Sequence, residues 1–83
     1  MGEIDFDGAD PIYAQLAAVI ESRIEDGTYQ PNRKIPSEAQ LRDEFDVSNT
    51  TVRGAIRVLV SKGLVRTVVG RGVFVLRPDD EEA

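Results

Sequence analysis

The chain has 83 residues, which makes one small domain near the lower limit at which a single apolar core supports folding without a metal or a disulfide. It contains no cysteine and no histidine. A disulfide framework, the usual zinc sites and any Ser-His or Cys-His nucleophile are therefore excluded, and no enzyme is expected. No apolar run approaches the roughly 18 residues of a membrane span, and no secretory signal opens the sequence, so a cytoplasmic protein without a membrane partner is predicted.

The net charge of −5 argues against nucleic acid as a partner, but the charges are unevenly distributed. Residues 1–46 carry four basic and eleven acidic side chains, and residues 79–82 add four acids. Residues 47–77 carry six basic side chains and no acidic one. This acid-free segment predicts a local positive footprint of the kind that meets nucleic-acid phosphates. Chance clustering on a solvated face is the alternative explanation.

The first nine residues are acidic and have no hydrophobic period, so a flexible acidic arm is expected over residues 1–9. Asp10 and Pro11 then predict the N-cap and the first position of a helix. Apolar side chains recur at every fourth position from Ile12 to Ile24. This spacing predicts an amphipathic helix that faces a core and ends at Gly27.

The residues from Thr28 to Lys34 are predicted to form a loop. Ile35 precedes a proline and is pushed towards an extended conformation, which allows a very short edge strand. The sequence Ser37-Glu38-Ala39-Gln40 is a capping box and predicts the start of a short second helix. The apolar side of that helix is expected to consist of Ala39, Leu41 and Phe45.

A third helix is expected to begin after Ser48, its N-cap, and to run to about Lys62. Gly63 follows as the residue that ends it in a left-handed conformation. The predicted buried stripe of this helix consists of Val52, Ala55, Ile56, Leu59 and Val60.

Two β-rich runs, Leu64–Val69 and Val73–Leu76, are joined by Gly70-Arg71-Gly72 and predict a hairpin. The order of helix, short strand, helix, tight turn, helix and hairpin is that of a winged helix-turn-helix, mainly α with a small antiparallel β-sheet. We assign residues 10–77 to this domain and residues 78–83 to an acidic tail or linker.

The third helix carries the first group of candidate functional residues. Asn49, Thr50, Arg53 and Arg57 are spaced so that they share one face opposite the apolar stripe. A recognition helix uses such N-terminal residues to reach base edges in the major groove, where Arg suits guanine and Asn suits adenine. Ser37 and Ser48 are further candidates, because helix N-termini offer free backbone N–H groups to phosphate. Ordinary solvent-facing polar residues are the alternative.

The hairpin supplies the second group. Gly70 and Gly72 meet the need of a tight turn for positive φ, but Arg71 between them is not required by the turn. A slender tip can bring one arginine to the minor groove or the backbone. Lys34, just before the second helix, and Arg66, on the hairpin, are candidates for phosphate contacts.

Three blocks stand between Pro11 and Val75: PIYAQLAAVIESRIEDGTY, KIPSEAQLRDEFDVSNTTVRGAIRVLVSKGLV and GRGVFV. Together they resemble the N-terminal DNA-binding domain of GntR-family bacterial transcription regulators, over about four-fifths of the chain. The resemblance implies a winged fold, no catalysis, dimeric binding to inverted repeats and usually a C-terminal effector-binding domain. Many relatives carry arginines that touch DNA where Ala39 and Asn49 stand here. Because Ala39 and Asn49 replace these arginines, we expect an unusual operator sequence. If the Asn49 amide contacts a base, the preferred base at that position is adenine.

We therefore predict sequence-specific binding of double-stranded DNA in transcription control, by a repressor rather than an activator, because occupying an operator needs no further surface. A homodimer is expected on an inverted-repeat operator or in a full-length parent, and a small-molecule effector only if that parent has a C-terminal domain. No cofactor and no metal is expected. The alternative is a winged-helix module that binds protein and never DNA, which an exposed apolar patch on the third helix would favour.

Overall fold

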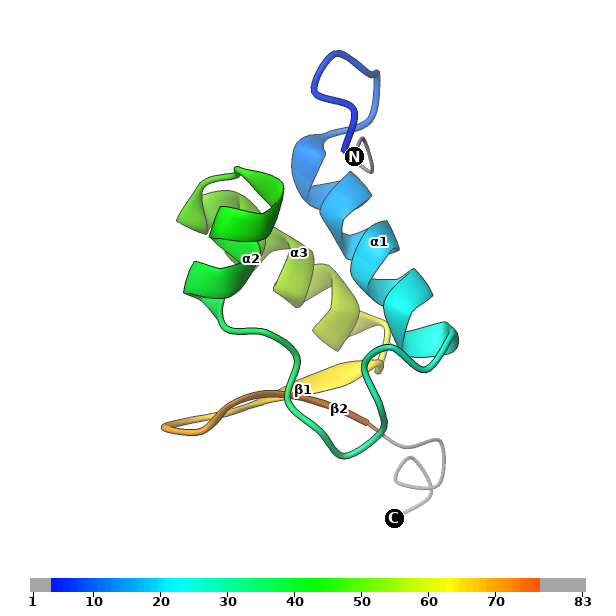
Figure 1. The fold of residues 1–83 in the computed structure, drawn as a ribbon, viewed down its shortest axis with the longest axis vertical. Coiled ribbons are helices and arrows are strands. Elements are labelled where there is room, and N and C mark those ends of the chain that lie inside the picture. The colour runs from blue at the N-terminus through cyan, green and yellow to red at the C-terminus, as the bar shows by residue number, and fades with distance from the viewer. Residues whose placement is uncertain (1–3, 77–83) are drawn as a thin grey trace.

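The computed structural model describes residues 4–76, which form three helices and a two-stranded antiparallel sheet (Figure 1). The elements in chain order are α1 (Ile12–Glu25), α2 (Glu38–Phe45), α3 (Asn49–Ser61), β1 (Val65–Val68) and β2 (Gly72–Val75). This is the predicted winged helix-turn-helix. The tail predicted over residues 78–83 lies outside the described residues.

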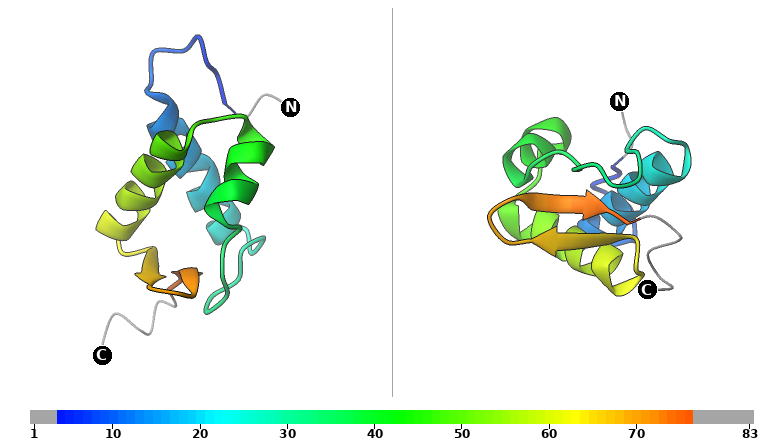
Figure 2. Two further views of the ribbon diagram at one scale, coloured as in Figure 1. Left: turned by 90° about the vertical axis from the view of Figure 1, so that its left-hand side faces the viewer. Right: turned by 90° about the horizontal axis from the view of Figure 1, so that it is seen from below.

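Helix α3 occupies the centre of the fold, where it packs against α1, α2 and β1 (Figures 1 and 2). Each element contributes an apolar face to one core, which lies around α3. Buried apolar surface is the main source of stability in a domain of this size. The buried core residues are Ile4, Leu16, Ala17, Ile20, Ile35, Leu41, Phe45, Val52, Ala55, Leu59, Val65 and Val75.

The start of α1 corrects one sequence expectation. Pro11 is itself the N-cap, with an extended backbone at φ −57° and ψ 147°, and no side chain caps the helix, so Asp10 does not have the predicted role. The preceding segment makes several contacts with α1 where the structure describes it. Ile4 is buried in the core, and the Asp5 N–H donates to Gln15 Oε1 at 2.6 Å. Gln15 also donates to the carbonyls of Asp5 and Asp10, both at 2.9 Å.

The caps of α2 and α3 follow the sequence closely. Ser37 Oγ accepts from the Gln40 N–H at 3.2 Å while Gln40 Oε1 accepts from the Ser37 N–H at 2.8 Å, which completes the predicted capping box. Ser48 caps α3 as expected. Gly63, with φ +76°, follows the C-cap Lys62 and terminates the helix, and the N–H groups of Gly63 and Leu64 donate to carbonyls of the last turn, both at 3.0 Å.

Two residues of the predicted apolar stripes are exposed. Ala39 lies on the solvent side of α2, whose buried residues are Leu41 and Phe45. Val60 is 44% exposed, because it lies one position beyond Leu59 and so turns away from the core towards the polar face of α3. The apolar side of each helix is therefore narrower than the sequence pattern predicted.

The hairpin forms with its turn one residue earlier than predicted. Val68 pairs with Gly72, so the turn consists of Val69, Gly70 and Arg71, and the Arg71 N–H donates to the Val68 carbonyl at 2.9 Å. The hairpin projects beyond the helices on the side where α2 lies (Figure 1). In place of the expected edge strand, the structure has one isolated antiparallel β-bridge, between Lys34 and Phe74. A longer strand would need a backbone N–H at Pro36, which proline lacks.

Within residues 4–76, no helix has both the length and the apolar character needed to cross a membrane.

Candidate nucleic-acid interface

Helix α3 separates its core residues from its candidate functional residues. Val52, Ala55 and Leu59 are completely buried. The four predicted contact residues Asn49, Thr50, Arg53 and Arg57 are all exposed on the opposite side of the helix. The polar face that the sequence predicted is thus present, and no core residue has to move for it to meet a partner.

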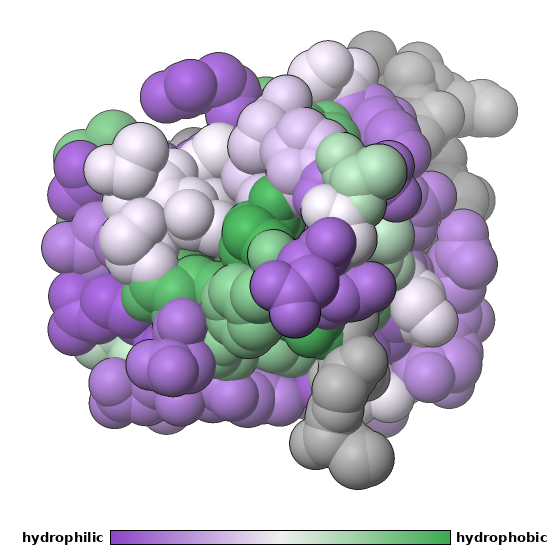
Figure 3. Space-filling model, turned by 90° about the horizontal axis from the view of Figure 1, so that it is seen from above, coloured by the Kyte–Doolittle hydropathy of each residue, from purple (hydrophilic) through white to green (hydrophobic). Residues whose placement is uncertain are grey.

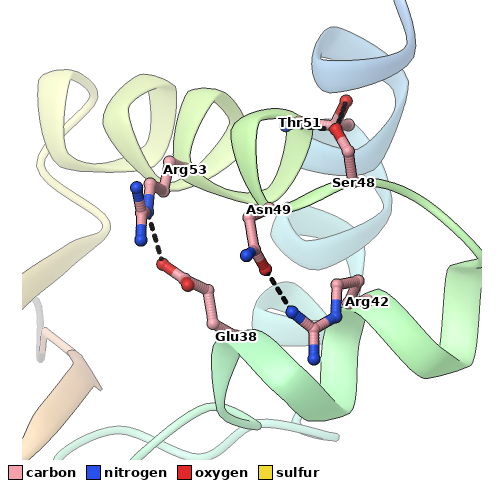
Figure 4. A network of polar contacts seen from close by, with 6 residues as sticks. All are labelled: Glu38, Arg42, Ser48, Asn49, Thr51 and Arg53. Carbon is pink, nitrogen blue, oxygen red and sulfur yellow. Dashed lines mark hydrogen bonds and ion pairs between the residues drawn. The ribbon is translucent and has the colours of Figure 1, made fainter.

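Two residues of this face are held by side chains of α2 (Figure 4). Arg42 Nη1 donates to Asn49 Oδ1 at 2.6 Å, and Arg53 Nε donates to Glu38 Oε2 at 3.0 Å. Glu38 and Arg42 are four residues apart on α2, as Asn49 and Arg53 are on α3, so each pair lies one turn from the other. The second pair is a salt bridge between side chains that are 64% and 42% exposed.

Surface ion pairs of this exposure contribute little to stability, of order 0–1 kcal/mol. Their effect here is geometric, because they fix where the polar groups of Asn49 and Arg53 point. Sequence reasoning missed both partners, Glu38 and Arg42. The matching four-residue spacings on the two helices were the available signal.

A groove of about 460 Å³ lies between the helix-turn-helix and the hairpin. Its lining brings together five of the predicted site residues, namely Lys34, Ser37, Arg53, Arg71 and Gly72. The Lys34 stem passes closely over Gly72, where an added Cβ would lie 3.1 Å from Lys34 Cδ. Gly72 also has φ +128°, which side chains rarely adopt, so the backbone favours glycine here, and the Lys34 stem would have to move slightly to admit a side chain.

The other six site residues do not line that groove; they are Ser48, Asn49, Thr50, Arg57, Arg66 and Gly70. Thr50 and Arg57 line a second hollow with Tyr13 of α1, on the other flank of α3. Arg66 pairs with Phe74 in the sheet and lies beside it on the outer face of the hairpin, whereas Thr67 faces the groove. The structure thus gathers one group around the groove and places Arg66 away from it.

The two serines are occupied as caps. Ser48 Oγ accepts from the Thr51 N–H at 3.2 Å, and its hydroxyl donates to Thr51 Oγ1 at 3.1 Å (Figure 4). Ser37 Oγ accepts from Gln40 in the same way. Both hydroxyls therefore serve the helix first, and the free backbone N–H groups of the first turn remain the groups that suit phosphate.

Arg23 ties α2 to α1 behind the candidate interface. Its guanidinium bonds Glu44 at 2.9 Å and the Tyr29 hydroxyl at 2.8 Å, and it lies 5.1 Å from the centre of the Phe45 ring. Burial alone would lower the pKa of Arg23, but the hydrogen bonds to Tyr29 and Glu44 outweigh it and raise the pKa above its ordinary value. Arg23 is thus permanently charged and helps to fix the position of α2.

Charge is unevenly distributed along the elements that form the candidate interface. From residue 47 to residue 76 the chain carries five basic side chains and no acidic one. Glu38 is the acidic residue that lines the groove among the described residues. In residues 4–76 no cluster of three or more metal-ligating side chains of the His, Cys, Asp or Glu type is present.

Curated proteins related to this chain are bacterial transcription regulators. The HTH-type transcriptional repressor NagR of Bacillus subtilis is 40% identical over 73 residues, which are 88% of this chain and 30% of that protein. The histidine utilization repressor of Pseudomonas aeruginosa is 36% identical, over 88% of this chain and 29% of that protein. The chain therefore spans about a third or less of the length of these relatives.

Solved structures with the same fold include AraR(DBD) in complex with operator ORX1, with a TM-score of 0.80, 43% identity and coverage of 87% of this chain and 93% of that one. A GntR family transcriptional regulator from Listeria monocytogenes has a TM-score of 0.82 and 31% identity, over 90% of this chain and 66% of that one. The family model described as "Bacterial regulatory proteins, gntR family" matches residues 12–75. With this match across the helix-turn-helix and the hairpin, the chain belongs to the GntR family of bacterial regulatory proteins.

Proposed function

We propose that this domain binds a specific sequence of double-stranded DNA and represses transcription by occupying an operator. The observation that carries the proposal is the exposed polar face of α3, which lies beside a groove bordered by Arg53, Arg71 and Lys34. A helix fits the major groove, and a basic hairpin next to it can meet the flanking backbone or minor groove. The complex of AraR(DBD) with an operator, at 43% identity, supports the same role for this fold.

Within this proposal the site residues divide by task. Asn49 and Arg53 suit base edges, because their side chains leave α3 near its N-terminus. Thr50 and Arg57, on the other flank of α3, suit phosphates of the opposite wall of the groove.

The groups beyond α3 suit the DNA backbone. Gly70 and Arg71 belong to the hairpin turn, which can approach the minor groove. Lys34 lies over Gly72, directly after that turn, where it suits phosphate. The helix starts at Ser37 and Ser48 offer backbone N–H groups to phosphate. Arg71 borders both the groove and the hollow on the outer face, whereas Arg66 borders only the latter, so we expect Arg66 to contribute less than Arg71.

The whole protein is proposed to act as a dimer on an inverted repeat. One α3 reads one half-site, and two-fold symmetry of the protein is mirrored in the DNA. A small-molecule effector would bind elsewhere in a longer parent chain, in keeping with the greater length of the curated relatives.

A protein-binding module without DNA is less well supported. Such a module needs an exposed apolar surface on α3, whose outward residues are mainly polar, with only Val60 at 44% exposure as a large apolar one. Figure 3 shows apolar surface, ringed by hydrophilic side chains, at the end of the molecule where the N-terminal segment meets α1. Phe6, which is 57% exposed, is the accessible large apolar side chain of that segment, and Tyr13 of α1, which is 44% exposed, lies beside Thr50 and Arg57.

The test compares binding of the chain to a duplex selected from a random pool with binding to a scrambled duplex. Arg53→Ala should reduce the preference for the selected duplex by about 5- to 150-fold, the usual value of a bidentate base contact. Lys62→Ala is the matched control, because it removes the same charge at the far end of α3. Equal binding of both duplexes by the unaltered chain, or equal effects of the two variants, would refute the proposal.

A further inference from the structure

The first turn of α3 carries no arginine, yet a guanidinium stands beside it. We infer that Arg42, from α2, is a specificity-determining residue that reads a guanine at the start of the recognition helix, and that Asn49 positions it. This inference rests on the proposed function, because it assumes that α3 enters the major groove.

The hydrogen bond between the two side chains fixes their orientation. An arginine has only donors, so the amide oxygen of Asn49 must face Arg42 and its NH₂ group must point the other way. The contact from Arg42 Nη1 to Asn49 Oδ1 is 2.6 Å and spans the gap between α2 and α3 (Figure 4). It uses one of the five N–H donors of the guanidinium. No other hydrogen bond of Arg42 is found among the side chains of residues 4–76.

The pair therefore presents donors to a base. The free guanidinium N–H groups and the amide NH₂ match the two acceptors of guanine, O6 and N7. Adenine would place its N6 amino group, a donor, next to the guanidinium. The adenine amino group could donate a hydrogen bond to the Asn49 oxygen, but it would still face the N–H donors of the guanidinium. The sequence alone favoured adenine for Asn49, and the position of Arg42 reverses this preference.

The neighbouring pair shows why Arg42 is the stronger candidate of the two arginines in Figure 4. Arg53 is bound to the carboxylate of Glu38 at 3.0 Å, so part of its charge is balanced before any DNA arrives. Arg42 is bound to a neutral amide and keeps its whole charge. Its side chain is also partly buried between the helices, which reduces the entropy lost when it meets a base.

The experiment selects preferred duplexes from a random pool for the 83-residue chain and for Arg42→Ala, Arg42→Met and Lys62→Ala. Arg42→Met retains the aliphatic stem in case the alanine variant folds poorly, and thermal melting checks each variant. The unaltered chain and Lys62→Ala should select guanine at one defined position. Both Arg42 variants should lose that guanine, by about 5- to 150-fold in relative affinity, and keep the other positions of the motif.

Three results would overturn the inference. Selection of adenine at that position, unchanged in the Arg42 variants, would show that Asn49 reads the base alone. A uniform loss of affinity for all sequences, with the slope of log K against log[salt] reduced by about one, would make Arg42 a phosphate contact. An unchanged motif and affinity would make the pair a link between the helices. If the unaltered chain selects no motif, the proposed function itself fails, whereas the first three results leave it standing.

Discussion

The N-cap of α3 offers a way to separate folding from DNA contact at a single position. Ser48 Oγ accepts from the Thr51 N–H at 3.2 Å, and both groups lie on the exposed side of the turn. Ser48→Ala removes the cap without adding charge. Ser48→Asp keeps an acceptor of equal quality but puts a carboxylate at the start of the proposed recognition helix. The two variants should therefore have opposite effects on stability and on binding.

The expected magnitudes follow from the geometry. Loss of the cap in Ser48→Ala should cost about 1 kcal/mol, which in a domain of this length lowers Tm by about 4–8 °C. Ser48→Asp should hold or slightly raise Tm, because a negative charge at a helix N-terminus is favourable by about 0.3–1 kcal/mol. For an assumed separation of about 6 Å between the new carboxylate and each of two phosphates, each phosphate would cost roughly 0.7 kcal/mol in water, or about ten-fold in Kd together.

The assay is thermal melting of the free domain, together with titration of a selected duplex at low salt and at a temperature where both variants are folded. Ser48→Ala should melt early and bind nearly as well as the unaltered chain, while Ser48→Asp should melt normally and bind weakly. Equal binding losses would mean that the hydroxyl itself contacts DNA. Full affinity in Ser48→Asp would mean that the start of α3 does not face phosphate, and the proposed docking would be wrong.

Two further predictions concern the hairpin and the pH dependence of stability. Arg71→Ala should weaken binding to all sequences and flatten the slope of log K against log[salt] by about one. Arg66→Ala, on the outer face, should change that slope less. Equal changes of the slope in the two variants would contradict the proposed orientation of the hairpin. Hydrogen bonds from Thr28 lower the pKa of Asp26, so its stabilising effect is present above about pH 4 and is lost as pH falls through the lowered pKa. When the free energy of unfolding is measured as a function of pH, Asp26→Asn should be less stable than the unaltered chain near neutral pH. The two should be equally stable at a pH below the lowered pKa of Asp26. A difference in stability that does not change with pH would show that the Asp26 carboxylate is not its cause.

Most features set by neighbouring residues could be predicted from the sequence, although the cap predicted at Asp10 was wrong. The capping box at Ser37, the cap at Ser48 and the helix end at Gly63 each depend on a few adjacent side chains, and the structure confirms all three. The exposed face of α3 was predictable for the same reason. The four-residue spacing of Arg53 and Arg57 puts them on one face of the helix, and the spacings of three and four residues between Val52, Ala55 and Leu59 put those on another.

Features set by distant residues could not be predicted. The burial of Ile4 depends on Gln15 holding the N-terminal segment against α1, and no local pattern announces that contact. The exposure of Ala39 depends on which side of a two-turn helix meets the core. The contact between Arg42 and Asn49 depends on how α2 and α3 are arranged relative to each other. These are tertiary effects, and they decide the finer properties of the site.

The division of α3 into a buried side and an exposed side has a consequence for how such a domain changes its target. Substitutions on the exposed side leave the core intact, so new specificities are accessible without a cost in folding, typically within about 0.5 kcal/mol. The links to α2 restrict this freedom, however, because Asn49 is coupled to Arg42 and Arg53 to Glu38. We expect libraries that vary positions 42 and 49 together, or 38 and 53 together, to yield more functional variants than libraries that vary α3 alone.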